Sequence, residues 1–339
     1  MAFCVPPEWS SHKAIWTAWP ASAEDWPAGF VAPRKDITAM VKALAGGDAV
    51  KVLACGEEAA LSARQAVGDV AEVIAFEYDD IWLRDTGPVF SRDEATGRFQ
   101  VEIFCFNGWG GKFDFPRDVV LAEKLAAYVG VGLRSHPLVL EGGSIDTDGE
   151  GTLLSTRECL LNPNRNPKWN VRRIEDVVLL AYGARKLIWI EQGLVNDHTD
   201  GHIDNLARFV GAGHVVCQSP SGKDDPNAEA LLAIENRLRS STDAEGKLLR
   251  VTTIPSPGLV KNSGGHILPA SHMNFIIGNK TVVVPVYNDF GKEAVAELAS
   301  VFRGRKVVGV PSFGLLTGGG ADLSGGGGSF HCITQQQPG

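Results

Sequence analysis

The sequence lacks several features that define whole classes of protein. Its longest apolar runs fall far short of the roughly 18 residues that a membrane-spanning helix needs, and no basic stripe or polybasic segment indicates binding to nucleic acid or to an anionic membrane. Only six cysteines are scattered through 339 residues without a CxxC pair, so no disulfide framework is predicted. Residues 1–8 have neither a basic nor an apolar region typical of a signal peptide. We therefore expect a reducing, cytoplasmic setting.

Two further absences limit the organisation of the chain. The glycine runs at 318–320 and 325–328 are not followed by Lys-Ser or Lys-Thr, which excludes a phosphate-binding loop of the usual kind. No linker rich in Pro, Gly or Ser divides the chain, so residues 1–339 are predicted to form a single α/β domain. The composition is ordinary for a globular protein, with 44% hydrophobic residues, and the net charge of −8 favours a cationic rather than an anionic ligand.

A repeated pattern runs through this chain. Helical spacing of apolar residues begins near Pro33 and then recurs near Glu57, Arg117, Arg173, Asn227 and Lys292, the last five starts lying 54 to 65 residues apart. Each of these five helices precedes an apolar or β-branched run, at 70–76, 131–140, 186–191, 249–255 and 306–313. A period of this length indicates repeated units arranged radially or linearly.

The polar residues of most interest follow these predicted strands. In order, they are Asp85, Glu141, His202 with Asp204, Asn262 to His266, and Cys332. If the five modules surround a central axis, the loops after the strands converge on one pocket, because ligand sites in α/β folds commonly lie beyond strand ends.

Each polar motif has a plainer alternative. Asp85, within 78–88, could bind a planar guanidinium through paired hydrogen bonds, or could belong to a solvated turn with one Asp–Arg pair. Glu141 precedes two glycines and could simply end a turn. His202 could act as an acid and base beside Asp204, pair with His198 as a metal ligand on a helix, or be structural; Gly201 favours a loop, which weakens the metal interpretation. Residues 146–151 are predicted to form a hairpin turn rather than a calcium loop.

Cys332 follows the 325–328 glycine run, where side-chain-free backbone can approach a bound molecule. The other cysteines mostly follow apolar residues and are predicted to be small core residues: Cys4, Cys55, Cys105, Cys159 and Cys217. Burial as an inert thiol is the alternative for Cys332 as well.

Taken together, WLRDTGP (82–88), FNGWGGK (106–112), LEGGSI (140–145), TDGHIDN (199–205) and GGGSFHCITQQQP (326–338) resemble the agmatine deiminases. More broadly, they resemble the guanidine-modifying enzymes that include arginine and peptidylarginine deiminases. The match extends in order over nearly the whole chain. The resemblance implies the pentein fold, an α/β propeller of five modules with pseudo-fivefold symmetry, in agreement with the repeat.

The resemblance also implies roles for individual residues. Cys332 becomes the nucleophile and His202 the general acid and base, while Asp85 and Asp204 hold the guanidinium and Glu141 supports the histidine. The implied reaction converts agmatine to N-carbamoylputrescine and ammonia through a thiouronium on the cysteine, a step of putrescine and polyamine biosynthesis. It needs no metal or organic cofactor. The expected partners are a small cationic guanidine and further copies of the chain in a homo-oligomer.

The identity of the substrate is the least determined feature. His198 stands where agmatine deiminases tend to carry glutamate, and Asp197 and Asp200 are the candidates to compensate for it. Trp82, Trp109, Trp19 and His198 are candidates to line the far end of the substrate, with a place in the core as the equal alternative for the tryptophans. Other hypotheses are a deiminase of arginine or peptidylarginine, an amidinotransferase, and a non-catalytic pentein that binds a partner.

Overall fold

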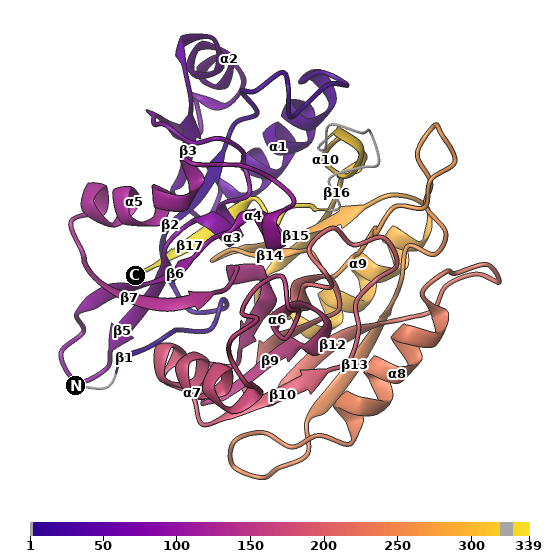
Figure 1. Cartoon of the computed structure of the whole chain (residues 1–339). Helices are drawn as coiled ribbons and strands as arrows, with labels where there is room; N and C mark the ends of the chain where they lie inside the picture. Colours follow the sequence, from indigo (N-terminus) through magenta and orange to yellow (C-terminus); the bar gives the residue numbers. More distant parts are fainter. Residues whose placement is uncertain (1–2, 319–327) are drawn as a thin grey trace.

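The computed structural model describes residues 3–318 and 328–339. Within these ranges the strands form five sheets, of which three have three strands and two have four. Every sheet contains the same unit: an antiparallel strand pair, then a helical crossover to a strand that lies parallel to the second. The five predicted helix–strand modules are confirmed by this arrangement (Figure 1).

The elements follow the modules. The first sheet joins β1 (Phe3–Cys4), β5 (Val89–Asp93), β6 (Phe99–Cys105) and β7 (Gly132–Val139), with helix α5 (Leu121–Val129) in its crossover. The second contains β8 (Ile145–Thr147), β9 (Thr152–Thr156) and β10 (Lys186–Ile190), with α6 (Arg157–Leu160) and α7 (Val171–Tyr182). The third contains β11 (Ala207–Gly211), β12 (His214–Ser219), β13 (Arg250–Pro255) and α8 (Ala228–Arg239).

The last two sheets lie at the ends of the sequence. The fourth contains β14 (Ile276–Ile277), β15 (Thr281–Val286), β16 (Lys306–Pro311) and α9 (Phe290–Val301). The fifth joins β17 (Thr334–Pro338) to β2 (His12–Ala18), β3 (Val50–Ala54) and β4 (Ala71–Ala75), with α1 (Val31–Leu44) and α2 (Glu57–Val67). Short helical segments are α3 (Leu83–Thr86), α4 (Gly108–Gly111), α10 (Phe313–Gly318), η1 (Asp118–Val120), η2 (Gly142–Ser144) and η3 (Ile203–Asn205).

Helix α7 shows how the sequence produces these elements. The Asn170 side chain caps its first turn by accepting a hydrogen bond from the Arg173 N–H at 2.9 Å, and such a cap stabilises a helix by about 1 kcal/mol. The helix buries Ile174 and Val178, four residues apart, against the sheet, and burying an aliphatic side chain of this size contributes about 1.5–3 kcal/mol. It ends at Gly183, whose φ of 66° is the left-handed conformation that glycine adopts readily.

The first and last parts of the chain are joined in one sheet. Strand β17 pairs antiparallel with β2, so that Gln336 lies opposite Ile15, and Figure 1 shows the yellow β17 beside the indigo β2. This pairing fixes the segment that directly follows Cys332. The turn between β8 and β9 is the predicted hairpin. No helix in residues 3–318 and 328–339 is both long and apolar enough to cross a membrane.

Candidate active site

Five polar residues after the strands lie buried in one region of the protein. Asp85 lies in α3 after β4, Glu141 lies between β7 and η2, and His202 and Asp204 lie at η3 after β10, whereas Cys332 follows α10 and precedes β17. All are at most 8% exposed. Residues that are up to 247 positions apart are thus brought together by loops from different modules.

Gly143 shows how closely three of these groups approach one another. A methyl group added to its Cα would lie 2.8 Å from Asp85 Oδ1, 2.8 Å from His202 Nδ1 and 3.1 Å from Asp204 Oδ2. These distances are shorter than normal contacts with a carbon atom. Only glycine therefore fits at the point where the two aspartates and the histidine converge.

The Asp85 carboxylate is held in a fixed orientation by two neutral donors. The Gly143 backbone N–H donates to Oδ1 and the Trp109 indole N–H donates to Oδ2, each at 2.9 Å. Burial raises the pKa of Asp85 to about 6; the charges of Asp204 and Glu141 raise it as well, against the effect of His202. A carboxylate in this situation gains stability when a cation binds beside it.

His202 lies between two carboxylates. Its Nδ1 is 3.7 Å from Asp85 Oδ1 and its Nε2 is 3.5 Å from Glu141 Oε2. Burial by itself lowers the pKa of His202, but the Asp85 and Glu141 carboxylates outweigh burial and raise this pKa well above its ordinary value. The imidazole is therefore protonated at neutral pH and can donate a proton.

Glu141 is fixed from its other side by Arg165. The Arg165 Nε donates to Glu141 Oε1 at 2.8 Å, and Arg165 also pairs with Asp200. Burial opposes ionisation of Glu141, but His202 and Arg165 lower its pKa below the ordinary value. The buried Cys159 thiol lies 3.8 Å from Glu141 Oε2 and donates a hydrogen bond to it. Glu141 is therefore an ionised acceptor beside the His202 imidazolium.

The Cys332 thiol faces both an amide and a carboxylate. Asn274 Nδ2 donates to Cys332 Sγ at 3.0 Å, and the Cys332 backbone N–H donates to Asn274 Oδ1 at 3.1 Å. Sγ also lies 3.5 Å from Asp204 Oδ2. Burial raises the pKa of Cys332 well above its ordinary value, and the charges of Asp204 and Asp85 raise it further. The resting residue is consequently a neutral thiol.

The other site predictions have mixed outcomes. The Trp109 indole binds Asp85, the Trp82 indole N–H donates to Asp80 Oδ2 at 2.7 Å, and Trp19 is 1% exposed in the largest core cluster. His198 is half-buried and its carbonyl accepts from Lys112. A role of Trp82, Trp109 and His198 in lining the substrate stays a prediction.

Two expectations were wrong. Residues 262–266 do not join the site: they form the tip of a mostly exposed turn closed by an antiparallel bridge between Lys261 and Ile267. The fourth module instead contributes Asn274, which lies two residues before the start of β14. Among the cysteines predicted for the core, Cys159 and Cys217 are buried, but Cys4 and Cys55 are half-buried and Cys105 is exposed. Residues 325–327 of the predicted loop lie outside the described residues.

Four further residues of the site were not predicted. They are Asn274, Arg165, Glu8 and His331, all at most 5% exposed. His331 Nδ1 lies 2.7 Å from Asp204 Oδ2, and its Nε2 lies 2.9 Å from Glu8 Oε2. The available signal was the position of His331, directly before the predicted nucleophile; Asn274 and Arg165 have no distinguishing pattern around them.

One group of side chains has the composition of a metal site. Glu141, Cys159 and His202 bring their ligating atoms within 4.8 Å of one another. A metal requires a deprotonated thiolate and a neutral imidazole, so both Cys159 and His202, whose pKa values are raised, would have to lose a proton for a metal to bind. The arrangement therefore suits proton sharing better than metal binding. His198, the other histidine of the metal hypothesis, is not in this group, because residues 196–202 are not helical.

Comparison with known proteins agrees with this geometry. Residues 4–338 match the model of the Porphyromonas-type peptidyl-arginine deiminase family, and the chain belongs to that family. This match indicates the class of guanidine-modifying enzymes. It is 37% identical to the agmatine deiminase of Stutzerimonas stutzeri, over 99% of this chain and 95% of that protein. The predicted resemblance to agmatine deiminases is thereby confirmed.

Solved structures show the same fold. The agmatine deiminase of Enterococcus faecalis superposes with a TM-score of 0.91 at 29% identity, covering 99% of this chain and 96% of that one. The C. jejuni agmatine deiminase, as a cysteine-to-serine variant with substrate bound, gives a TM-score of 0.87 at 26% identity, covering 99% and 96%. These likenesses, with the five sheets, confirm the predicted pentein-type α/β fold.

Proposed function

We propose that this protein hydrolyses the guanidinium group of agmatine to N-carbamoylputrescine and ammonia, with Cys332 as the nucleophile. One observation carries the proposal: two buried carboxylates and a histidine converge at Gly143, and the Cys332 thiol lies 3.5 Å from one of these carboxylates, at Asp204 Oδ2. A planar cation bound between Asp85 and Asp204 would place its central carbon beside Sγ. The names of the Stutzerimonas and Enterococcus relatives support agmatine as the substrate.

The residues divide the chemistry in a consistent way. Asp85 and Asp204 hold the positive charge on the guanidinium, which keeps its carbon electrophilic. The bound cation also offsets the charges that raise the pKa of Cys332, and a thiolate is a far better nucleophile than a thiol. The nearest carboxylate acceptor for the thiol proton is Asp204 Oδ2, at 3.5 Å.

Bond formation and cleavage then follow in two halves. Sulfur adds to the guanidinium carbon, His202 gives its proton to one nitrogen, and the C–N bond breaks to release ammonia and leave a thiouronium on Cys332. The neutral His202 next takes a proton from water, and the hydroxide adds to the same carbon. The C–S bond then breaks as the proton of the added hydroxyl passes to sulfur, which releases the ureido product and restores the thiol. The proton held by Asp204 leaves with ammonia as ammonium. Glu141 stabilises the imidazolium in both halves.

A deiminase of free or peptide-bound arginine is the second candidate, favoured by one observation. Asp200 pairs with both Lys112 and Arg165, and Asp197 accepts from the Thr199 N–H and hydroxyl at 2.9 and 2.6 Å. Both carboxylates are therefore occupied within their own surroundings, which weakens the idea that they replace the glutamate where His198 stands.

The test is formation of ureido product from agmatine and L-arginine in parallel, with Cys332→Ala as the control. Turnover of agmatine alone supports the proposal, and turnover of arginine changes the substrate but keeps the mechanism. A new guanidine that forms only when an amine acceptor is present, without ureido product, would indicate an amidinotransferase. Absence of turnover by folded, reduced protein would favour a binding module.

A further inference from the structure

A buried chain of polar groups continues from Asp204 through His331 to Glu8. Asp204 Oδ2 contacts His331 Nδ1 at 2.7 Å, and His331 Nε2 contacts Glu8 Oε2 at 2.9 Å. Asp204, His331 and Glu8 are 0%, 3% and 5% exposed. Glu8 precedes His331 by 323 positions in the sequence, so the N-terminal segment reaches the residue next to the nucleophile.

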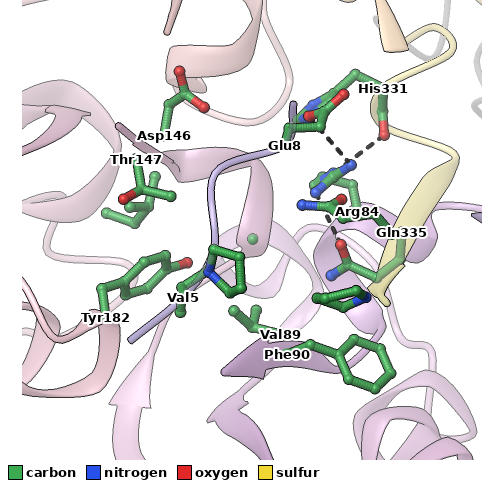
Figure 2. Close-up of a pocket in the computed structure, with 15 residues that line it drawn as sticks. Val5, Glu8, Arg84, Val89, Phe90, Asp146, Thr147, Tyr182, His331 and Gln335 are labelled. Carbon is green, nitrogen blue, oxygen red and sulfur yellow. Dashed lines mark hydrogen bonds and ion pairs between the residues drawn. The ribbon is translucent and has the colours of Figure 1, made fainter. Parts of the chain in front are cut away.

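The Glu8 carboxylate is held on several sides. Its Oε1 accepts from the Ile277 backbone N–H at 2.7 Å, and its Oε2 also pairs with the Arg208 guanidinium. The Arg84 Nη2 lies 3.9 Å from Glu8 Oε2, and the Arg84 Nη1 donates to Gln335 Oε1 at 2.9 Å. Figure 2 shows the contacts that Arg84 makes with Glu8, His331 and Gln335. Glu8 is therefore fixed by groups from four separate parts of the chain.

These contacts place His331 between two ionised carboxylates. Burial disfavours charge on Glu8, but Arg208 and His331 lower its pKa well below the ordinary value; for Asp204, hydrogen bonding from His331 likewise overcomes burial. Ionised carboxylates can only accept hydrogen bonds. Because His331 contacts one on each side, each ring nitrogen is in position to donate a hydrogen bond to a carboxylate.

The contact with His331 determines which Asp204 oxygen is available to the substrate. Asp204 Oδ2 is occupied by His331, whereas Asp204 Oδ1 is buried and has no hydrogen-bond partner in the part of the chain that the structure describes. A buried carboxylate oxygen without a partner is costly, so Oδ1 is available to a guanidinium N–H. Rotation of the carboxylate would exchange the two oxygens, and the bond from His331 opposes it.

A small cavity borders this chain. It has a volume of about 40 Å³, and its lining includes Glu8, Arg84, Tyr182 and His331 but none of the five predicted catalytic residues. This size holds one or two water molecules. Replacement of Glu8 or His331 by a side chain of similar size therefore leaves room for hydration, which favours folding of the variants described next.

We propose that His331, held by Glu8, is a positioning residue that fixes Asp204 for binding of the substrate guanidinium. The proposal rests on the proposed function. It is tested by two substitutions that separate the two ring nitrogens. The amide nitrogen of asparagine takes the place of Nδ1, so His331→Asn keeps a donor to Asp204. That of glutamine takes the place of Nε2, so His331→Gln keeps only the donor to Glu8.

We expect His331→Gln to raise KM for the guanidine substrate by about tenfold or more, because a charge-assisted hydrogen bond to Asp204 is lost. His331→Asn should change KM by only about threefold. Calorimetric titration of agmatine into the same variants on the Cys332→Ala background should show the same order of Kd. Agmatine is replaced by L-arginine if that is the substrate that the wild type uses.

His136→Gln is the matched control. The His136 Nε2 contacts the buried Glu102 carboxylate at 2.7 Å outside the site, so this change should affect Tm but leave KM and Kd unchanged. Equal KM and Kd for the asparagine and glutamine variants of His331 would overturn the proposal. If His331→Gln does not fold, Glu8→Gln replaces it and is expected to raise Kd several-fold. An unchanged Kd for folded Glu8→Gln would also overturn the proposal. Failure of the proposed function is distinct, because the wild type itself would then be inactive.

Discussion

Asn274 and Cys332 form a two-point contact, in which the amide nitrogen donates to Sγ at 3.0 Å and the amide oxygen accepts from the Cys332 backbone N–H at 3.1 Å. A third bond, from Nδ2 to Asn205 Oδ1 at 3.0 Å, fixes the orientation of the amide. The amide therefore fixes the direction of the thiol, and it stabilises the thiolate once that forms, since hydrogen bonding to Asn274 lowers the pKa of Cys332 against the effect of burial.

Substitution Asn274→Leu removes both contacts but keeps a similar volume. We expect kcat/KM to fall about 10- to 100-fold, because a hydrogen bond to a charged nucleophile is worth about 1.5–3 kcal/mol. Asn288→Ala is the control, since that side chain bonds the Pro257 carbonyl outside the site. Steady-state kinetics that show equal activity for both variants would contradict a role for Asn274.

The pH dependence follows from Asp85. Binding of a guanidinium requires its ionised form, and burial raises its pKa to about 6 in the free enzyme. Below that pH the carboxyl is protonated and neutral, so kcat/KM should rise about tenfold per pH unit below 6 and level off above it. The measurement is kcat/KM from pH 4.5 to 8, with far-UV circular dichroism to show that the protein stays folded. A profile that is flat from pH 5 to 7 would exclude this titration.

Local sequence patterns were sufficient to predict the modules but not every member of the site. Apolar spacing identified α7, whose buried residues recur with the helix period. A continuous apolar run identified β10, whose last three residues are all buried. Asp85, Glu141, His202, Asp204 and Cys332 were placed together by their positions after strands and by family resemblance. The catalytic roles of these five residues stay predictions. So do the single domain, the propeller symmetry and the homo-oligomer.

The missed residues share a physical reason. Asn274 lies between Met273 and Phe275 in a buried apolar run, and only the fold brings it to Cys332. Arg165 and Glu8 are charged residues whose burial depends on partners 24 and 200 or more positions away. The error at 262–266 arose because the chain continues through an exposed turn before it enters the site. Contacts of this range leave no periodicity in the sequence.

The reactivity of Cys332 provides another prediction. Because burial and two carboxylates raise its pKa, the free enzyme should react with iodoacetamide at pH 7.5 more slowly at Cys332 than at the exposed Cys105. Mass spectrometry of digested samples measures both rates in one experiment, so that Cys105 serves as the internal control. Faster labelling of Cys332 would show that its thiolate exists before substrate binds.

Gly143 provides the most stringent test of the site geometry. An alanine methyl there would lie 2.8 Å from Asp85 Oδ1 and from His202 Nδ1. Either these side chains move apart, or the methyl group occupies the space between them. We expect Gly143→Ala to lower kcat/KM by about 100-fold or more, since displacement of catalytic groups by about 1 Å has effects of this size.

The matched control is Gly132→Ala, at the start of β7 in the same module. An added methyl at Gly132 meets no atom within 4 Å, so this variant should keep wild-type kinetics. Because neither glycine has a positive φ, both variants can keep the native backbone, and thermal unfolding should confirm that each is folded. Full activity of folded Gly143→Ala would mean that Asp85, His202 and Asp204 do not act together on one bound group.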